Sequence, residues 1–274
     1  MPSYSIEPNP KVTYTLRYED EHVLVIEKPS RIATQPGLGH DRSSLLNGLY
    51  FNYGTKLQKL GAKRDYGLLH RLDRETSGVL IVALTSEAYD QLRSDFERRT
   101  IKKFYWAIVK RAPTPPSGVV RKPIIEVDAK SDTSTRKVKL ARLSRSGKPA
   151  ITAYRTLAHS DLGALVECRP VTGRLHQVRV HMAALGSTVL GDEFYATAGV
   201  ADASPRLALH AHRIRFSHPI TGATIDAHAP MPRDLKSLMT RLRLVMPTHA
   251  PTSELIADTE PLEKLGSAGS HDDL

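Results

Sequence analysis

Short apolar segments rich in β-branched residues recur along the chain and constrain its fold more than any other feature. Residues 12–20 and 22–29 predict two strands split by an acidic turn, and 150–159 with 163–171 predict a second pair. Helical patterns are fewer and do not alternate strictly with the strands. We therefore expect an α+β fold with a long mixed, mostly antiparallel sheet flanked by helices and loops, and not a doubly wound sheet.

The run GVLIVAL at 78–84 predicts a buried strand, and a helix capped by Thr85 or Ser86 should follow to about Arg99. A further helix is expected over Arg174–Leu185, with Thr172 as N-cap and Gly186 just beyond its end. The remaining expected elements are a short helix at 44–57, a strand at 104–110, a hairpin at 206–230 and a final amphipathic helix at 232–245.

The chain of 274 residues is long enough to bury a substantial core. We expect a flexible N-terminus at 1–11, one folded domain at 12–246 and an acidic, disordered tail at 247–274. No apolar run approaches the roughly 20 residues of a membrane helix, and the N-terminus lacks an apolar signal core. We therefore expect a cytoplasmic protein, and a monomer.

The single cysteine, Cys168, rules out a disulfide framework or a zinc knuckle built from this chain alone.

Charge is divided unevenly between the body of the chain and its tail. The whole chain carries +10, from 39 basic and 29 acidic residues. Six acids and one base lie after residue 248, so the tail is −5 and the remainder is +15. A body this basic favours a polyanionic partner, most often nucleic acid, over an enzyme that merely happens to be basic.

The stretch LLHRLDRETSGVLIVA at 68–83 places Asp73 between Arg71 and Arg74, just before the predicted buried strand. A carboxylate at the rim of a core is costly unless it is paired, and arginine can bind it with two parallel hydrogen bonds. An aspartate kept ionised in a partly dry pocket can act as a nucleophile or a base. A salt bridge or a turn cap is an equally good reading of this motif alone.

Two further motifs carry candidate site residues. On the helix predicted within 171–186, Arg179 lies at the edge of the apolar stripe, where it could meet a partly buried carboxylate. In the strand IKKFYWAIVK, alternation places Tyr105 on the same face as Lys103, an arrangement that suits base stacking as well as an ordinary half-buried tyrosine.

Metal binding has weak support in the sequence. His176 and His181 are five residues apart and should lie on opposite sides of their helix. His210 and His212 share one face of a strand, but no acidic or thiol partner is evident at a suitable spacing. We therefore expect no metal site.

The sequence GLLHRLDRETSG at 67–78 resembles the signature of the RluA-type RNA pseudouridine synthases. YEDEHVLVIEKPS, KKFYWA and TGRLHQVRVHMAALGSTVLGDEFY resemble supporting motifs of that family, in the same order, and the resemblance extends from about Tyr14 to about Pro232. It most resembles the short form without an S4 domain. The resemblance implies a single α+β catalytic domain that binds RNA in a basic cleft.

The resemblance also implies roles for particular residues. Asp73 would be the catalytic carboxylate, Tyr105 would stack on the flipped base, and Arg179 would pair with Asp73. Arg71 would enter the RNA and fill the gap left by the flipped nucleotide. The candidate RNA-binding residues, taken from the same motifs, are His70, Arg71, Lys103, Arg174 and His176.

Uridine isomerisation breaks the N1–C1′ bond and joins C5 to C1′ without redox change, so we expect neither cofactor nor metal. Two routes stay open: addition of Asp73 to C1′, and a glycal-like route with proton transfer at C2′. The expected substrates are stem-loops of large-subunit rRNA, tRNA or both. The alternatives are a non-catalytic RNA-binding or assembly module that kept the fold, and a metal-dependent hydrolase using His210 and His212.

Overall fold

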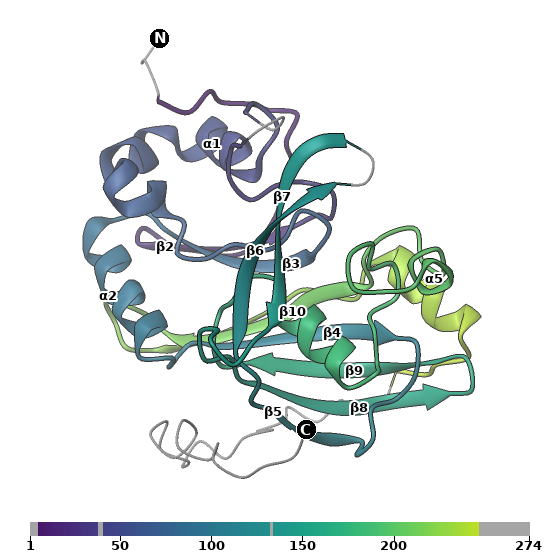
Figure 1. Cartoon of the computed structure of the whole chain (residues 1–274). Coiled ribbons are helices and arrows are strands. Elements are labelled where there is room, and N and C mark those ends of the chain that lie inside the picture. The colour runs from purple at the N-terminus through teal and green to yellow at the C-terminus, as the bar shows by residue number, and fades with distance from the viewer. Residues whose placement is uncertain (1–4, 38–40, 132–133, 247–274) are drawn as a thin grey trace.

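The computed structural model describes residues 5–37, 41–131 and 134–246, and its central feature is a long sheet (Figure 1). Within that part of the chain the sheet has nine strands, in the order β1-β2-β3-β10-β4-β9-β8-β5, with β11 paired to β10. The strands are β1 (Thr15–Glu19), β2 (Val23–Lys28), β3 (Ser77–Ala83), β4 (Lys102–Val109), β5 (Ser117–Val120), β8 (Thr152–Ser160), β9 (Gly163–Pro170), β10 (Leu209–Ser217) and β11 (Thr224–His228).

The sheet is mixed and mostly antiparallel, so the predicted α+β class is confirmed. Among the described strands, β3 and β10 form the one parallel pair, through His210 opposite Ser77 and Ala211 opposite Gly78. The backbones approach closely here, because a Cβ on Gly78 would lie 2.2 Å from the Ala211 carbonyl oxygen. Gly78 also has a φ of +124°, which disfavours any side chain. The glycine is thus required where the two halves of the sheet meet.

Each half of the sheet has its own apolar core. One core packs around β2 and β3, whose apolar residues are covered by α1 and α2. The other packs around β4 and β9 and includes apolar residues of α3 and α5. The helices are α1 (Leu45–Leu60), η1 (Ala62–Gly67), α2 (Ser86–Glu97), α3 (Gln177–Ala184), α4 (Ala198–Ala201) and α5 (Arg233–Arg241).

Most of the predicted elements form as expected, but the helix after β9 begins later than predicted. Thr85 caps α2 by accepting a hydrogen bond from the backbone N–H of Ala88. The α3 helix, however, starts at Gln177 rather than Arg174, because His176 has a left-handed backbone with φ 52°. The Gln177 side chain accepts from the backbone N–H of Arg174 and from the Thr172 hydroxyl, so it holds residues 172–176 as a turn.

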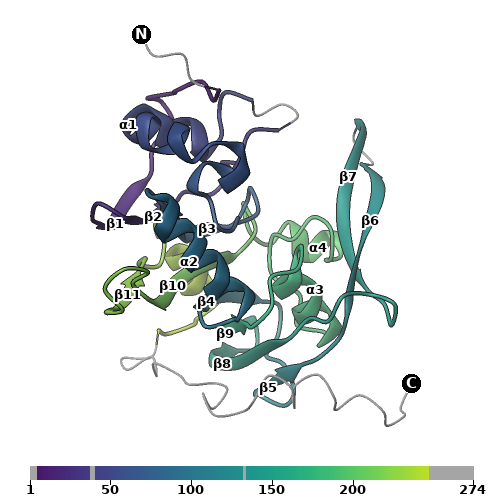
Figure 2. The same ribbon diagram turned by 90° about the vertical axis from the view of Figure 1, so that its left-hand side faces the viewer.

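The segment 126–149 is polar and basic, a composition that predicts an exposed excursion, but it lies largely within a regular two-stranded ribbon. Its strands β6 (Ile124–Ser131) and β7 (Ser134–Leu143) pair with each other in a separate sheet. Figure 2 shows this ribbon standing apart from the long sheet, on the side of α3, and β7 contacts that helix. The ribbon therefore extends from the body of the protein next to the helix that carries Arg179.

The ends of the chain are described only in part. Residues 5–11 contact the α1 region: Asn9 bonds to Asn47 and Arg42, and Ser5 bonds to Gln58. The predicted tail at 247–274 lies outside the described residues, and the domain boundaries stay a prediction. No described helix combines the length and apolarity that a membrane crossing requires.

Candidate active site

Asp73 lies in the loop that leads into β3, and buried contacts fix this loop on both sides. Leu72 exchanges two hydrogen bonds with the Thr34 hydroxyl. The fully buried Lys28 ammonium donates to three carbonyl oxygens, of Pro29, Ile32 and Arg74. Burial lowers the pKa of Lys28 to about 7, against the opposing effect of Asp73. These contacts tie the loop to the end of β2.

Arg179 joins Asp73 to a second carboxylate. Its Nη1 donates to Asp73 Oδ2 at 3.1 Å, while Nε and Nη2 bind both oxygens of Asp192 at 2.8 Å. Burial opposes the charge of Arg179, but the hydrogen bonds and charges of the two aspartates raise its pKa above the ordinary value. The Asp192 side chain is wholly buried and also accepts from the backbone N–H groups of Phe194 and Tyr195. Arg179 is thus a permanent cation aimed at Asp73.

The Asp73 carboxylate remains partly open to solvent. Its side chain is 26% exposed, whereas that of Arg179 is 6% exposed. The Nε2 atom of His176 lies 3.8 Å from Asp73 Oδ2. Asp73 is therefore held from the protein side and still accessible from the cleft.

Asp73 lines a cleft whose volume is about 610 Å³, which is within the usual range for a small-molecule site. The cleft is lined by the Asp73 loop, the end of α2, β4 and the turn that leads into α3, with Glu126 contributed by β6. Its basic lining residues outnumber the acidic ones and are Arg71, Arg93, Arg99, Lys103, Arg174 and Arg179. This balance suits a polyanion that brings one group to Asp73.

Tyr105 and Lys103 both line this cleft, as the alternation of their strand predicts. Burial raises the pKa of Tyr105, and the nearby Asp73 carboxylate adds to the effect, so the ring stays an uncharged phenol at neutral pH. Lys103 packs with its Nζ 5.7 Å from the centre of the Phe96 ring. A flat aromatic surface therefore lies in the same cleft as the carboxylate, with a lysine beside it.

Known proteins are similar to this chain in both sequence and architecture. Residues 22–184, more than half of the chain, match the family model described as RNA pseudouridylate synthase. The chain belongs to this family. The dual-specificity RNA pseudouridine synthase RluA of Escherichia coli is 39% identical over 218 residues, which cover 78% of this chain and 91% of the relative. The ribosomal large subunit pseudouridine synthase D of Zymomonas mobilis is 37% identical, covering 83% of this chain and 72% of the relative.

A solved structure agrees with these matches. The human RNA pseudouridylate synthase domain containing 4 superimposes with a TM-score of 0.65 at 29% identity, covering 85% of this chain and 94% of that one. The chain is therefore an RluA-type RNA pseudouridine synthase, which is an isomerase.

The predicted RNA-binding residues differ in what they offer to a ligand of this synthase. Arg71 is exposed at the cleft, whereas Arg174 is half-buried and donates to the Pro149 carbonyl oxygen. His70 packs on Phe96 and accepts from the backbone N–H of Ile81, and burial lowers its pKa to about 3. His70 is therefore neutral and offers RNA no charge.

Two histidines considered for metal binding, His210 and His212, form hydrogen bonds with other side chains. His210 bonds to the Ser77 hydroxyl at 2.9 Å, and His212 bonds to Glu167 at 3.0 Å and stacks on Trp106. In the residues that the structure describes, no group of three or more histidine, cysteine, aspartate or glutamate side chains is placed to hold a metal ion.

Sequence reasoning missed two residues that shape this site, Asp192 and Lys28. Each has a visible signal: Asp192 follows the apolar run TVLG, and Lys28 ends the buried strand β2. A charged residue adjoining a buried segment needs a partner, which is the argument that singled out Asp73. The same argument applied to every such position would have marked both residues.

Lys103 should make RNA affinity depend on pH. Burial lowers its pKa to about 8. Its charged fraction then falls from about nine tenths at pH 7 to about a quarter at pH 8.5, so affinity should fall by up to about fourfold. A Lys103→Arg variant keeps its charge and should lose most of this dependence, as measured by fluorescence anisotropy with a labelled stem-loop RNA. Equal slopes for the two proteins would show that Lys103 does not cause the effect.

Proposed function

We propose that this synthase isomerises a uridine held in the cleft, with Asp73 as the catalytic carboxylate. The observation that carries the proposal is the contact between Asp73 and Arg179, within a basic cleft that also holds Tyr105. The buried Arg179 guanidinium donates a hydrogen bond to Asp73, while partial exposure leaves the carboxylate within reach of a ribose. An ionised carboxylate is what both chemical routes require.

In this proposal the target uridine leaves the RNA stack and enters the cleft. Unstacking costs a few kcal/mol, and phosphate contacts with the basic lining supply affinity that offsets it. Tyr105 stacks on the uracil ring and keeps it close to C1′ while the glycosidic bond is broken. Arg71, exposed beside Asp73, takes the vacated position in the RNA. Asp73 acts on the ribose, at C1′ or at C2′.

We infer that the substrates are stem-loops of large-subunit rRNA, tRNA or both. The name of the Zymomonas mobilis relative specifies the ribosomal large subunit, and that of the Escherichia coli relative specifies dual specificity. The location in the cytoplasm and the monomeric state stay predictions.

Tritium release from RNA labelled at C5 of uridine tests the proposal directly, because C5 loses its hydrogen when it is joined to C1′. The purified chain should release tritium from large-subunit rRNA transcripts, from tRNA transcripts or from both, without added cofactor. Chemical mapping of pseudouridine in RNA from a strain lacking the gene should then locate the missing sites. Failure to release tritium from any RNA of that strain would overturn the proposal.

A further inference from the structure

His176 lies beside Asp73, and each of its ring nitrogens faces a defined neighbour. Nδ1 is 2.8 Å from the Tyr195 hydroxyl, and Nε2 is 3.8 Å from Asp73 Oδ2. The ring is stacked parallel to Phe194, at 6.1 Å and 10°, and meets Tyr195 edge-on. Only 9% of the side chain is exposed. The imidazole is therefore held in one orientation, with one nitrogen directed at Asp73.

The Tyr195 hydroxyl determines which nitrogen of His176 carries the proton. It accepts a hydrogen bond of 2.9 Å from the backbone N–H of Ala141, which can only donate. The phenol has one proton of its own, and among the described contacts the acceptor for it is His176 Nδ1. Burial lowers the pKa of His176 to about 4, so the ring is neutral at pH 7. A neutral ring that accepts at Nδ1 has its proton on Nε2.

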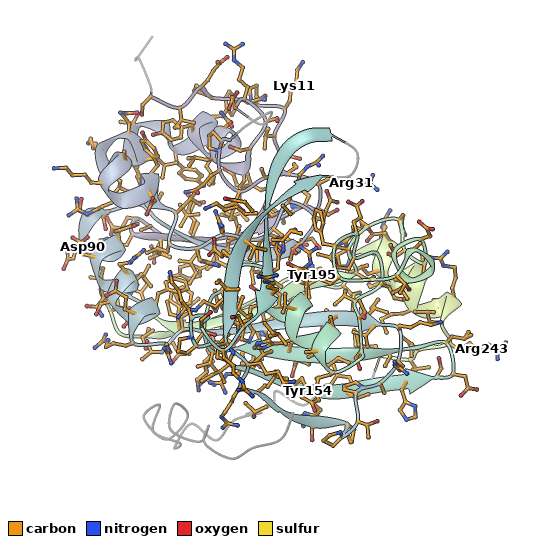
Figure 3. All side chains as sticks on the ribbon, viewed as in Figure 1. Lys11, Arg31, Asp90, Tyr154, Tyr195 and Arg243 are labelled. Carbon is orange, nitrogen blue, oxygen red and sulfur yellow. The ribbon has the colours of Figure 1, made fainter. Side chains whose placement is uncertain are left out.

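This arrangement distinguishes the two oxygens of Asp73. Arg179 donates to Oδ2, and Nε2 of His176 lies 3.8 Å from the same atom. Within the described residues, these contacts leave Oδ1 without a protein partner. Ala141 belongs to β7, so the ribbon of β6 and β7 contributes a backbone group to the network; Figure 3 labels Tyr195, which links the ribbon to the turn before α3.

We propose that His176 is a positioning residue for the isomerisation: with its proton fixed on Nε2 by Tyr195, it binds Asp73 Oδ2 together with Arg179, so that Oδ1 is the oxygen that acts on the ribose. This inference rests on the function proposed above for Asp73. The present 3.8 Å separation closes to a hydrogen bond when the uridine fills the cleft, since catalytic hydrogen bonds are often long before the substrate is bound.

Two amides test the role of the Nε2 proton. In place of His176, the side-chain amide of glutamine puts an N–H near the position of Nε2. The shorter side chain of asparagine puts its amide only near the position of Nδ1. We expect kcat of His176→Asn to fall about tenfold with KM within about twofold, and His176→Gln to stay within about threefold of the wild type. The left-handed backbone at residue 176 favours asparagine, so backbone strain predicts the opposite order. Equal activities, or a better asparagine variant, would overturn the proposal.

A spectrum tests the tautomer without any turnover. In a two-bond ¹H–¹⁵N correlation of histidine-labelled protein, the His176 signal, identified by its loss in His176→Asn, should show protonation at Nε2. Tyr195→Phe keeps the ring and should give mixed tautomers and a kcat about tenfold lower. Protonation at Nδ1 in the wild type, or an unchanged kcat in Tyr195→Phe, would refute the inference. An inactive wild type would refute the proposed function and leave the spectrum as a separate test.

Discussion

Replacing Asp73 by asparagine should abolish tritium release, with a loss of about 10³-fold or more, while RNA affinity stays within about threefold of the wild type. The amide is nearly isosteric with the carboxylate, but it is neutral and can neither attack C1′ nor take a proton from C2′. Single-turnover tritium release gives the rate, and filter binding gives the affinity. Activity near that of the wild type would refute the role of Asp73.

The same variant makes a prediction about stability that separates chemistry from folding. In Asp73→Asn, Arg179 keeps both of its hydrogen bonds to Asp192, so no buried charge loses its partner. The midpoint of urea unfolding should therefore change little. A large loss of stability would mean that the effect on activity comes from a damaged fold rather than from the missing carboxylate.

Arg179→Met should impair both catalysis and folding, and it should do so for different reasons. The rate should fall about 10²- to 10³-fold, because Asp73 loses its charged hydrogen-bond donor, while RNA affinity falls much less. The free energy of unfolding should fall by about 3–5 kcal/mol, because the buried Asp192 carboxylate loses its cation and keeps only two backbone donors. Equal losses in rate and affinity would indicate that Arg179 is only a phosphate contact.

The double variant Arg179→Met/Asp192→Asn provides the matched control. Removing the second charge should recover at least about half of the stability lost by Arg179→Met, since no unpaired carboxylate then remains. Activity should stay as low as in the single variant, because nothing replaces the donor to Asp73. Recovery of activity together with stability would show that Arg179 acts only on the fold.

Sequence patterns predicted the local elements well, because those elements depend on near neighbours. The run that became β3 is buried throughout, and β8 and β9 form an antiparallel pair joined by a short turn. The start of α3 could not be predicted in this way, because the Gln177 side chain holds the preceding turn in place of an N-cap. The position of β10 between β3 and β4 depends on close approach at Gly78, which no local pattern shows.

The candidate site was predictable to a different extent. Asp73 stood out because a charged residue adjoined a buried strand, and the helical wheel of 171–186 placed Arg179 near a buried face. The resemblance to a family paired the two across 106 residues of chain. The contacts of Asp192, and the link from Ala141 through Tyr195 to His176, depend on loops brought together only in the folded chain. Spacing along the sequence carries no information about such contacts.

The central position of β10 has a consequence for the order in which the protein is made. Asp73 lies in the loop before β3, in one half of the fold, and Arg179 lies on α3, which packs against the other half. The strand between the two halves of the sheet, β10, begins only at Leu209. On the ribosome, every proposed catalytic residue is therefore synthesised before the strand that brings them together. A chain that ends before β10 carries all of these residues but lacks the strand that joins β3 to β4. The topology thus makes assembly of the proposed site depend on the synthesis of β10.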